Sequence, residues 1–172
     1  KDIRIDPGYT SPLLRAKETA QIILGDRDVP LYEDSRIEEL SFGSYEGMRA
    51  AGGEKDAQSE AFNRFFTDTA NYIPPRDAET VPQLYERTGD FLAEICARED
   101  LRDKSVLVST HGAAMTALLN RIRGNLSVSE FWRDEVPPNC SVTEVEIRDA
   151  KPQIIREGVI YYKEKVKKWK TV

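Results

Sequence analysis

The sequence is short of the residues that build disulfides and zinc sites. Its 172 residues include one histidine, His111, and two cysteines, Cys96 and Cys140. Two cysteines cannot form a disulfide framework, and together with one histidine they fall short of a four-ligand zinc site. We therefore expect no bound metal, and the small number of thiols fits a reducing cytoplasm.

The chain also lacks long apolar runs and an excess of basic residues. Residues 22–24 and 106–108 are typical of its apolar runs, whereas a helix needs roughly 20 apolar residues to span a bilayer. No stretch resembles a signal peptide. The 25 Lys and Arg stand against 30 Asp and Glu, a net charge of −5, without the basic patch around aromatic side chains that nucleic-acid binding requires. We expect neither a membrane span nor a nucleic-acid partner.

What the chain does contain is enough apolar material for one core. Hydrophobic residues make up 40% of the sequence and charged residues 32%, which excludes global disorder. The length suits one ordinary domain, so we expect a single domain over residues 1–172. The composition leaves the oligomeric state open.

Strand-like and helix-like segments alternate along the chain, which predicts an α/β fold. Ser11 is an expected N-cap, with Pro12 at the first helical position and Gly25 as the stop. The predicted order is strand 5–10, helix 12–24, strand 29–32, a loop at 36–43, helices 55–69 and 80–99, strand 105–109, helix 113–123, a short helix from the capping box 127–130, and strands 140–147 and 153–162. We expect a three-layer sandwich with a largely parallel central sheet and helices on both faces, which binds its ligand beyond the carboxyl ends of the strands.

Arg15 and His111 follow two of these predicted strands and so lie at that edge of the sheet. His111 precedes Gly112 and a helix start, where backbone N–H groups and the helix dipole favour an anion. An arginine fork suits the paired oxygens of phosphate. The alternatives are a histidine satisfied by a neighbour and a solvated surface arginine.

Three acids in the loop after the second predicted strand could act as a proton donor. Glu38, Glu39 and Glu46 lie within nine residues, and a carboxyl group beside a phosphate can protonate a departing alkoxide. Acidic loops are also commonly just solvated. Position alone does not choose among the three.

Three separated segments resemble the histidine phosphatase superfamily, which includes cofactor-dependent phosphoglycerate mutases and small phosphomonoesterases. Residues 9–20 are similar to its strand-to-helix segment, residues 36–47 to its acid loop, and residues 106–112 to its second histidine motif. Residues 79–87 and 139–143 also fit, so the resemblance covers nearly the whole chain in order.

The resemblance implies a role for each candidate residue. Arg15 binds the transferred phosphoryl group, and the His111 imidazole contacts its oxygens beside Gly112. Glu39, three residues before the aromatic of the loop, is the implied proton donor. The family's fold is the phosphoglycerate mutase-like sandwich, and no cofactor is implied, because arginine and imidazole supply the positive charge that magnesium supplies elsewhere.

One departure from the family pattern is large. The family's nucleophile is a histidine in an Arg-His-Gly triplet on the central strand, and His111 is the one histidine of this sequence. Because Lys1 comes just before the family's second strand, we expect a segment of roughly 40 to 50 residues upstream. Without it, two inner strand edges would stay unpaired, and the 172 residues alone would be inactive.

The expected function is hydrolysis of a small phosphorylated metabolite through a phosphohistidine intermediate. A phosphoglycerate mutase is the first alternative, but the mutase pattern has tyrosine at Phe42, lysine at Ala50 and asparagine at Ala113, and an arginine pair where this chain has separated Arg64 and Arg76. A non-catalytic phospholigand-binding domain or decayed enzyme is the second alternative. The sequence does not identify the phosphomonoester.

Overall fold

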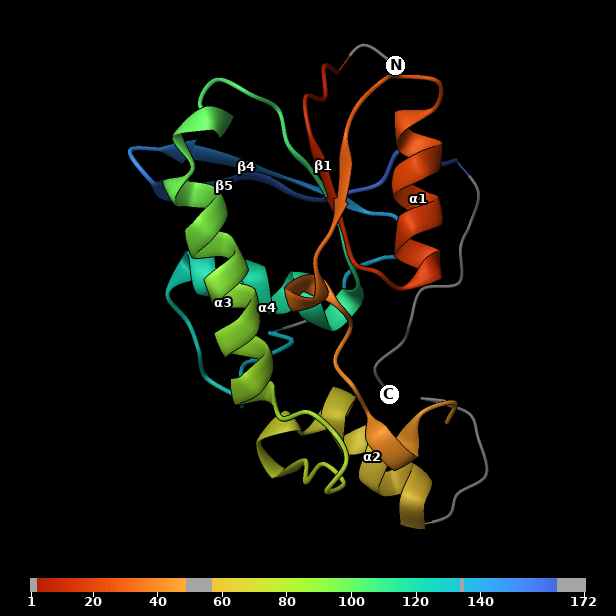
Figure 1. The fold of residues 1–172 in the computed structure, drawn as a ribbon. Coiled ribbons are helices and arrows are strands. Elements are labelled where there is room, and N and C mark those ends of the chain that lie inside the picture. Colours follow the sequence, from red (N-terminus) through yellow and green to blue (C-terminus); the bar gives the residue numbers. More distant parts are fainter. Residues whose placement is uncertain (1–2, 49–56, 134, 164–172) are drawn as a thin grey trace.

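The structure is a computed structural model that describes residues 3–48, 57–133 and 135–163. Its helices are α1 (Leu14–Leu24), α2 (Ala57–Thr67), α3 (Val81–Ala97) and α4 (Gly112–Arg123), and its strands are β1 (Gly8–Thr10), β2 (Leu31–Glu33), β3 (Leu107–Ser109), β4 (Val142–Arg148) and β5 (Lys151–Val159). The chain has the predicted α/β fold, with a parallel sheet at its centre (Figure 1). Among these residues no helix is long and apolar enough to cross a membrane.

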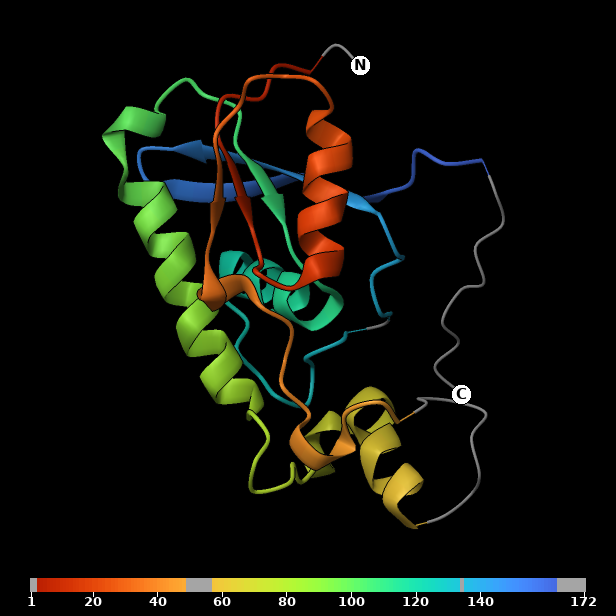
Figure 2. The same ribbon diagram turned by 45° about the vertical axis from the view of Figure 1, so that its right-hand side comes forward.

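The central sheet has the order β2-β1-β3, and all three strands are parallel. Tyr9 points from β1 into a core formed with Phe91 of α3 and Leu118 of α4. On the other face, Ser109 of β3 donates a hydrogen bond of 2.8 Å to the carbonyl oxygen of Ala16 in α1. Successive side chains of a strand point to opposite faces, so helices cover both sides of the sheet, as Figures 1 and 2 show.

The expectation of two unpaired inner strand edges is wrong for β1. Gly8 of β1 lies opposite Leu31 of β2 and also opposite Leu107 of β3, so the strand is paired on both edges. Buried backbone groups must find partners, and a direct pairing of β1 with β3 supplies them. Strands β4 and β5 form a separate antiparallel hairpin, which confirms their predicted pairing.

Two sequence signals for a helix start, at Ser11 and at residues 127–130, do not act as predicted. Helix α1 begins at Leu14 rather than Pro12, and Ser11 does not cap it, because the Ser11 hydroxyl lies against His111 and accepts from the backbone N–H of Leu13. The capping box at 127–130 starts no helix: the Glu130 carboxylate binds the Asn125 amide instead.

An aromatic cluster joins α2 to the rest of the domain at the end toward which β1 and β2 run (Figure 2). Fully buried Phe65 of α2 packs edge to face against Trp132, with ring centroids 5.3 Å apart, and the Trp132 indole donates to the Phe65 carbonyl oxygen at 2.8 Å. Aromatic contacts of this kind add stability beyond the area they bury. The α2 segment is therefore seated over the carboxyl end of the sheet. The predicted helix 55–69 is confirmed for residues 57–67, and residues 55 and 56 lie outside the described ranges.

Gly43 makes a close contact between the loop after β2 and the segment before α3. Its φ is +55°, and a Cβ built there would lie 2.8 Å from the backbone nitrogen of Ala78. We expect Gly43→Ala to lower the free energy of unfolding by about 3 kcal/mol, since both the left-handed backbone and the backbone contact oppose a side chain. Gly124 has a φ of +73° with no atom within 4 Å of its built Cβ, so Gly124→Ala should cost about 1 kcal/mol. Urea unfolding measures both, and equal losses would contradict the close contact.

Candidate active site

Arg15 and His111 meet where β1 and β3 end. The loop after β1 carries Arg15 into the first turn of α1, and His111 lies between β3 and α4. The Arg15 Nε–H donates to His111 Nδ1 at 3.1 Å, and His111 Nε2 lies 2.8 Å from the hydroxyl of Ser11. Since Nδ1 accepts, the proton of a neutral imidazole is on Nε2 and is donated to Ser11. His111 is buried and Arg15 is exposed, so the arginine faces the side from which a ligand would arrive.

Glu39 lies against the N-terminus of α4, next to this pair. Its Oε1 accepts from the backbone N–H groups of Leu40, Ala113 and Ala114 at 3.0, 3.1 and 3.2 Å. A Cβ built on Gly112 would lie 3.7 Å from Glu39 Oε2, so the helix start approaches the carboxyl group closely. The unpaired N–H groups and the dipole of a helix N-terminus attract anionic groups. The three sequence candidates Arg15, Glu39 and His111 thus come together at one edge of the sheet.

The other two acids of the loop have different positions. Glu46 Oε1 accepts from the backbone N–H of Phe42 at 2.8 Å, which closes a turn within the acid loop. Glu38 contributes its backbone carbonyl to a hydrogen bond from Arg87. Of the three, Glu39 is the one whose carboxyl group lies beside the helix that follows His111.

Burial shifts the pKa values of His111 and Glu39 in opposite directions. Desolvation, reinforced by the positive charges of Arg15 and Arg87, lowers the pKa of His111 to about 4. Desolvation raises the pKa of Glu39 above its ordinary value, although its three backbone hydrogen bonds and Arg15 oppose this shift. The imidazole is therefore neutral near pH 7, and the glutamic acid retains its proton to a higher pH than a solvated one.

The lowered pKa of His111 predicts a loss of stability in acid. The unfolded chain binds a proton at His111 near pH 6.5 and the folded chain only near pH 4, so stability falls as the pH drops between these values. A pKa difference of this size between the folded and unfolded chain corresponds to about 3 kcal/mol of unfolding free energy. Glu39 acts in the opposite sense, since its raised pKa costs stability as the pH rises above 4.5.

Comparing the protein with His111→Asn isolates the histidine from this opposing effect. The difference in unfolding free energy between the two proteins, from urea titrations at pH 4 to 7, should shrink steadily toward low pH. A difference that stays constant over this range would show that His111 titrates normally in the folded protein.

Sequence patterns did not reveal three of the contacts around the site. Ser11 was expected to cap a helix and instead touches His111. Thr110 donates to the carbonyl oxygen of Ile37 at 2.7 Å, which joins the end of β3 to the acid loop. Arg87 of α3 donates to the carbonyl oxygens of Glu38 and Glu39 at 2.9 and 3.2 Å. The resemblance of residues 79–87 to the family was the one signal that pointed to Arg87.

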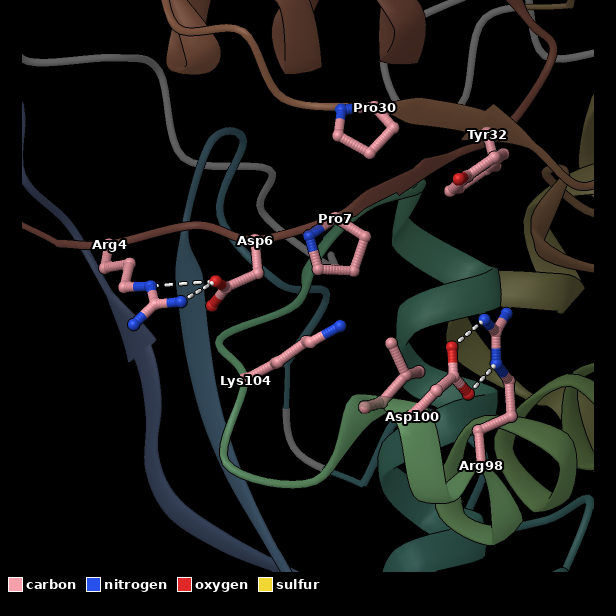
Figure 3. A pocket seen from close by; sticks show the side chains of 9 residues that line it. Arg4, Asp6, Pro7, Pro30, Tyr32, Arg98, Asp100 and Lys104 are labelled. Atoms are coloured by element: carbon pink, nitrogen blue, oxygen red, sulfur yellow. Dashed lines mark hydrogen bonds and ion pairs between the residues drawn. The ribbon is translucent and has the colours of Figure 1, made fainter.

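A pocket of about 370 Å³ lies at the opposite edge of the sheet, where the parallel strands begin (Figure 3). Arg4 pairs with Asp6 and Arg98 with Asp100, each at 2.5 Å, and Lys104 also lines the pocket. Because carboxylates already neutralise the guanidinium groups, this pocket suits phosphate less well than the edge with Arg15. Within the described ranges, no three His, Cys, Asp or Glu side chains gather closely enough to hold a metal ion.

The arrangement of Arg15, Glu39 and His111 occurs in a chain that matches a known protein family. A family model described as "Histidine phosphatase superfamily (branch 1)" matches residues 1–159. The chain belongs to this superfamily. The family-level resemblance of the sequence motifs is confirmed, and so is the phosphoglycerate mutase-like fold.

Relatives of this chain include proteins named as phosphatases and proteins named as mutases. It is 34% identical over 145 residues to a probable 2-carboxy-D-arabinitol-1-phosphatase of Arabidopsis thaliana. The match covers 84% of the chain and 29% of the relative. The chain is 28% identical over 149 residues to a 2,3-bisphosphoglycerate-dependent phosphoglycerate mutase of Staphylococcus epidermidis, covering 71% of the chain and 65% of the relative. The chain thus spans less than two thirds of the length of either relative.

Among solved structures, YhfR of Bacillus stearothermophilus superimposes on this chain with a TM-score of 0.81 at 26% sequence identity. The match covers 93% of the chain and 77% of YhfR.

Three positions that differ from the mutase pattern carry apolar residues in this chain. Phe42 packs edge to face against Phe62 and Phe65, with centroids 5.0 and 5.1 Å away. Ala113 has a small buried side chain and offers its backbone N–H to Glu39. Ala50 lies outside the described residues.

Proposed function

We propose that the whole protein hydrolyses phosphomonoesters of a small metabolite through a phosphohistidine intermediate. The observation that supports this proposal is the meeting of Arg15 and His111 at the carboxyl end of the parallel strands, with Glu39 on the adjoining helix start. This is the edge at which α/β sheets bind their ligands. Membership of the histidine phosphatase superfamily supports phosphoester chemistry at this edge.

In the proposed mechanism, Arg15 binds the phosphoryl oxygens through its guanidinium. His111 and the backbone around Gly112 complete the oxyanion site at the N-terminus of α4. A histidine of an Arg-His-Gly triplet attacks phosphorus, so that a P–N bond forms while the P–O bond to the leaving group breaks. His111 is the one histidine among the 172 residues, so the proposal concerns the whole protein rather than this chain alone.

In the proposed mechanism, Glu39 donates a proton in the first half of the reaction and accepts one in the second half. It gives its proton to the departing oxygen, which leaves as an alcohol, and then as a carboxylate accepts a proton from the water that cleaves the P–N bond. Burial against α4 supports this role, since it favours the protonated form before the first step. Arg15 provides the positive charge, so the proposal includes no metal or cofactor. We place the activity in the cytoplasm, in line with the low cysteine content.

A phosphoglycerate mutase is the second candidate, favoured by the relative from Staphylococcus epidermidis. A mutase must hold the dephosphorylated product and return the phosphoryl group to it. Phe42 packs within the aromatic cluster of α2 and offers no hydroxyl for this purpose, which supports hydrolysis over transfer.

Turnover of a panel of phosphomonoesters by the whole protein tests the proposal. We expect release of inorganic phosphate, inhibition by orthovanadate, and an acid-labile, base-stable phosphoenzyme in rapidly quenched samples. Transfer of phosphate to phosphoglycerate at a rate above hydrolysis would favour the mutase. Binding of phosphate without any turnover would favour the non-catalytic alternative.

A further inference from the structure

Arg87 of α3 donates hydrogen bonds to backbone carbonyl groups of the acid loop. Its side chain is 22% exposed. Its Nη1 donates to the carbonyl oxygens of Arg36 and Glu38 at 2.8 and 2.9 Å, and its Nη2 donates to the carbonyl oxygen of Glu39 at 3.2 Å. One guanidinium therefore holds three carbonyl groups within four consecutive residues.

Glu79 fixes the orientation of that guanidinium. Its two carboxylate oxygens accept from Arg87 Nε and Nη2 at 2.5 and 2.7 Å, the bidentate geometry that arginine and carboxylate favour. The Glu79 side chain is 16% exposed, and its backbone N–H donates to the carbonyl oxygen of Ser41 at 2.8 Å. The segment before α3 and the acid loop are thus joined by backbone and side-chain hydrogen bonds.

The acid loop depends on such contacts because it has little regular structure of its own. Between β2 and α2 the described chain forms two short 3₁₀ turns, Ser35–Ile37 and Gly43–Tyr45, and Glu39 lies between them. Residues outside helices and sheets lack a regular ladder of backbone hydrogen bonds, so side-chain hydrogen bonds to their backbone help to position them. A carboxyl group that must meet a leaving oxygen needs placement to within a fraction of an ångström.

We propose that Arg87, oriented by Glu79, is a positioning residue that fixes the backbone of residues 36–39 so that the Glu39 carboxyl group stays on the N-terminus of α4. The inference rests on the proposed function for the role of Glu39 as proton donor. Arg87 reaches Glu39 through its backbone carbonyl, and the proposed effect on catalysis runs through that residue. The charge of Arg87 also helps to lower the pKa of His111. The Glu79–Arg87 pair also ties the acid loop to the segment that leads from α2 into α3.

The first test follows the Glu39 carboxyl group directly and needs no activity. Carbon-13 NMR of glutamate-labelled protein, with the signal assigned from Glu39→Gln, gives the pKa of this group. In Arg87→Gln we expect the pKa of Glu39 to fall toward the ordinary glutamate value, because the freed loop exposes the carboxyl group to water. An unchanged Glu39 pKa in a folded Arg87→Gln protein would overturn the proposal.

The second test is the dependence of turnover on the leaving group in the whole protein. With an alkyl phosphate we expect Arg87→Gln to lower kcat by about tenfold or more, because protonation of the leaving oxygen is impaired. With an activated aryl phosphate kcat should change by less than about threefold, with KM for both and affinity for vanadate little altered, since these depend on Arg15 and His111. Equal losses of kcat on both substrates would indicate general structural damage and overturn the proposal.

Two variants and a control guard against a simple folding defect. Glu79→Gln retains an acceptor for Arg87 but loses the charge, and its effects should be of the same kind and smaller. In Arg87→Ala, added guanidinium should restore part of the alkyl phosphatase activity, and absence of rescue in a folded variant counts against the proposal. Arg98→Gln breaks a comparable bidentate pair, with Asp100, just after the C-terminus of α3, and should leave the substrate ratio unchanged.

The two tests separate this inference from the proposed function. If the unmodified protein hydrolyses neither substrate, the proposed function fails, whereas the NMR titration still decides whether Arg87 positions Glu39. If the protein is active and Arg87→Gln changes neither the Glu39 pKa nor the substrate ratio, the proposed function stands and the positioning role fails.

Discussion

Arg15→Ala should weaken the binding of orthovanadate to the whole protein by about a hundredfold, equivalent to ~3 kcal/mol. The Arg15 Nε–H is already directed to His111 Nδ1, and in the described part of the chain the two terminal nitrogens donate no further hydrogen bond. They are the groups that can form paired, charge-assisted bonds to an oxyanion. With Arg15 absent, the anion would lose these donors and meet His111, whose pKa is lowered mainly by burial.

Isothermal calorimetry on matched variants measures this loss. Arg15→Lys keeps the charge without the planar fork, so its affinity should lie between those of the alanine variant and the unmodified protein. Lys17→Ala removes a positive charge two residues further along α1, where Lys17 pairs with Glu33 on the surface, and should change the affinity by less than about threefold. An Arg15→Ala protein that binds vanadate normally would place the anion site elsewhere.

Local sequence signals identified the helices and strands correctly wherever local chemistry alone determined them. Gly25 and Gly124 follow the last residues of α1 and α4, as predicted helix stops should. The reciprocal capping box of Thr80 and Gln83 that starts α3 is just as local, although it was not among the predicted signals. These features depend on residues within one turn of one another. The sequence therefore contains the information needed to predict them.

The signals failed where another residue bound the same group, a distant residue in one case and a nearby one in the other. The Ser11 hydroxyl could have capped a helix starting at Pro12, but the ring of His111, 100 positions away, takes it as a partner. Glu130 could have completed a capping box, but the amide of Asn125 binds its carboxylate. No periodicity in the sequence records the contact between Ser11 and His111, because the folded packing brings the two residues together.

The choice among the three acids shows the same limit. Glu38, Glu39 and Glu46 are equivalent in charge and close in sequence, and the motif resemblance singled out Glu39. The structure supplies a physical difference: the Glu39 carboxyl group lies on the α4 N-terminus and the Glu46 carboxyl group caps a backbone N–H in its own loop. The contact that separates them spans 74 positions of the sequence.

Glu39→Gln should lower kcat for an alkyl phosphate by about a hundredfold or more in the whole protein, the usual range for loss of a general acid. Glutamine has the same shape and can still accept the N–H of Ala113, so the loop should keep its place, but it has no proton to give. An aryl phosphate with a good leaving group needs little protonation, and its kcat should fall by less than about tenfold. This asymmetry distinguishes a proton donor from a residue that binds the phosphoryl group.

The pH dependence gives an independent check on the same residue. Because Glu39 donates only when protonated, alkyl phosphate turnover should decline as the pH rises through its raised pKa, and this decline should be absent in Glu39→Gln. Glu38→Gln, one position away, should retain both the substrate ratio and the pH profile of the unmodified protein. Equal losses on alkyl and aryl substrates, or a larger effect of Glu38→Gln, would show that Glu39 is not the acid, since neither pattern can arise from losing the proton that the leaving oxygen requires.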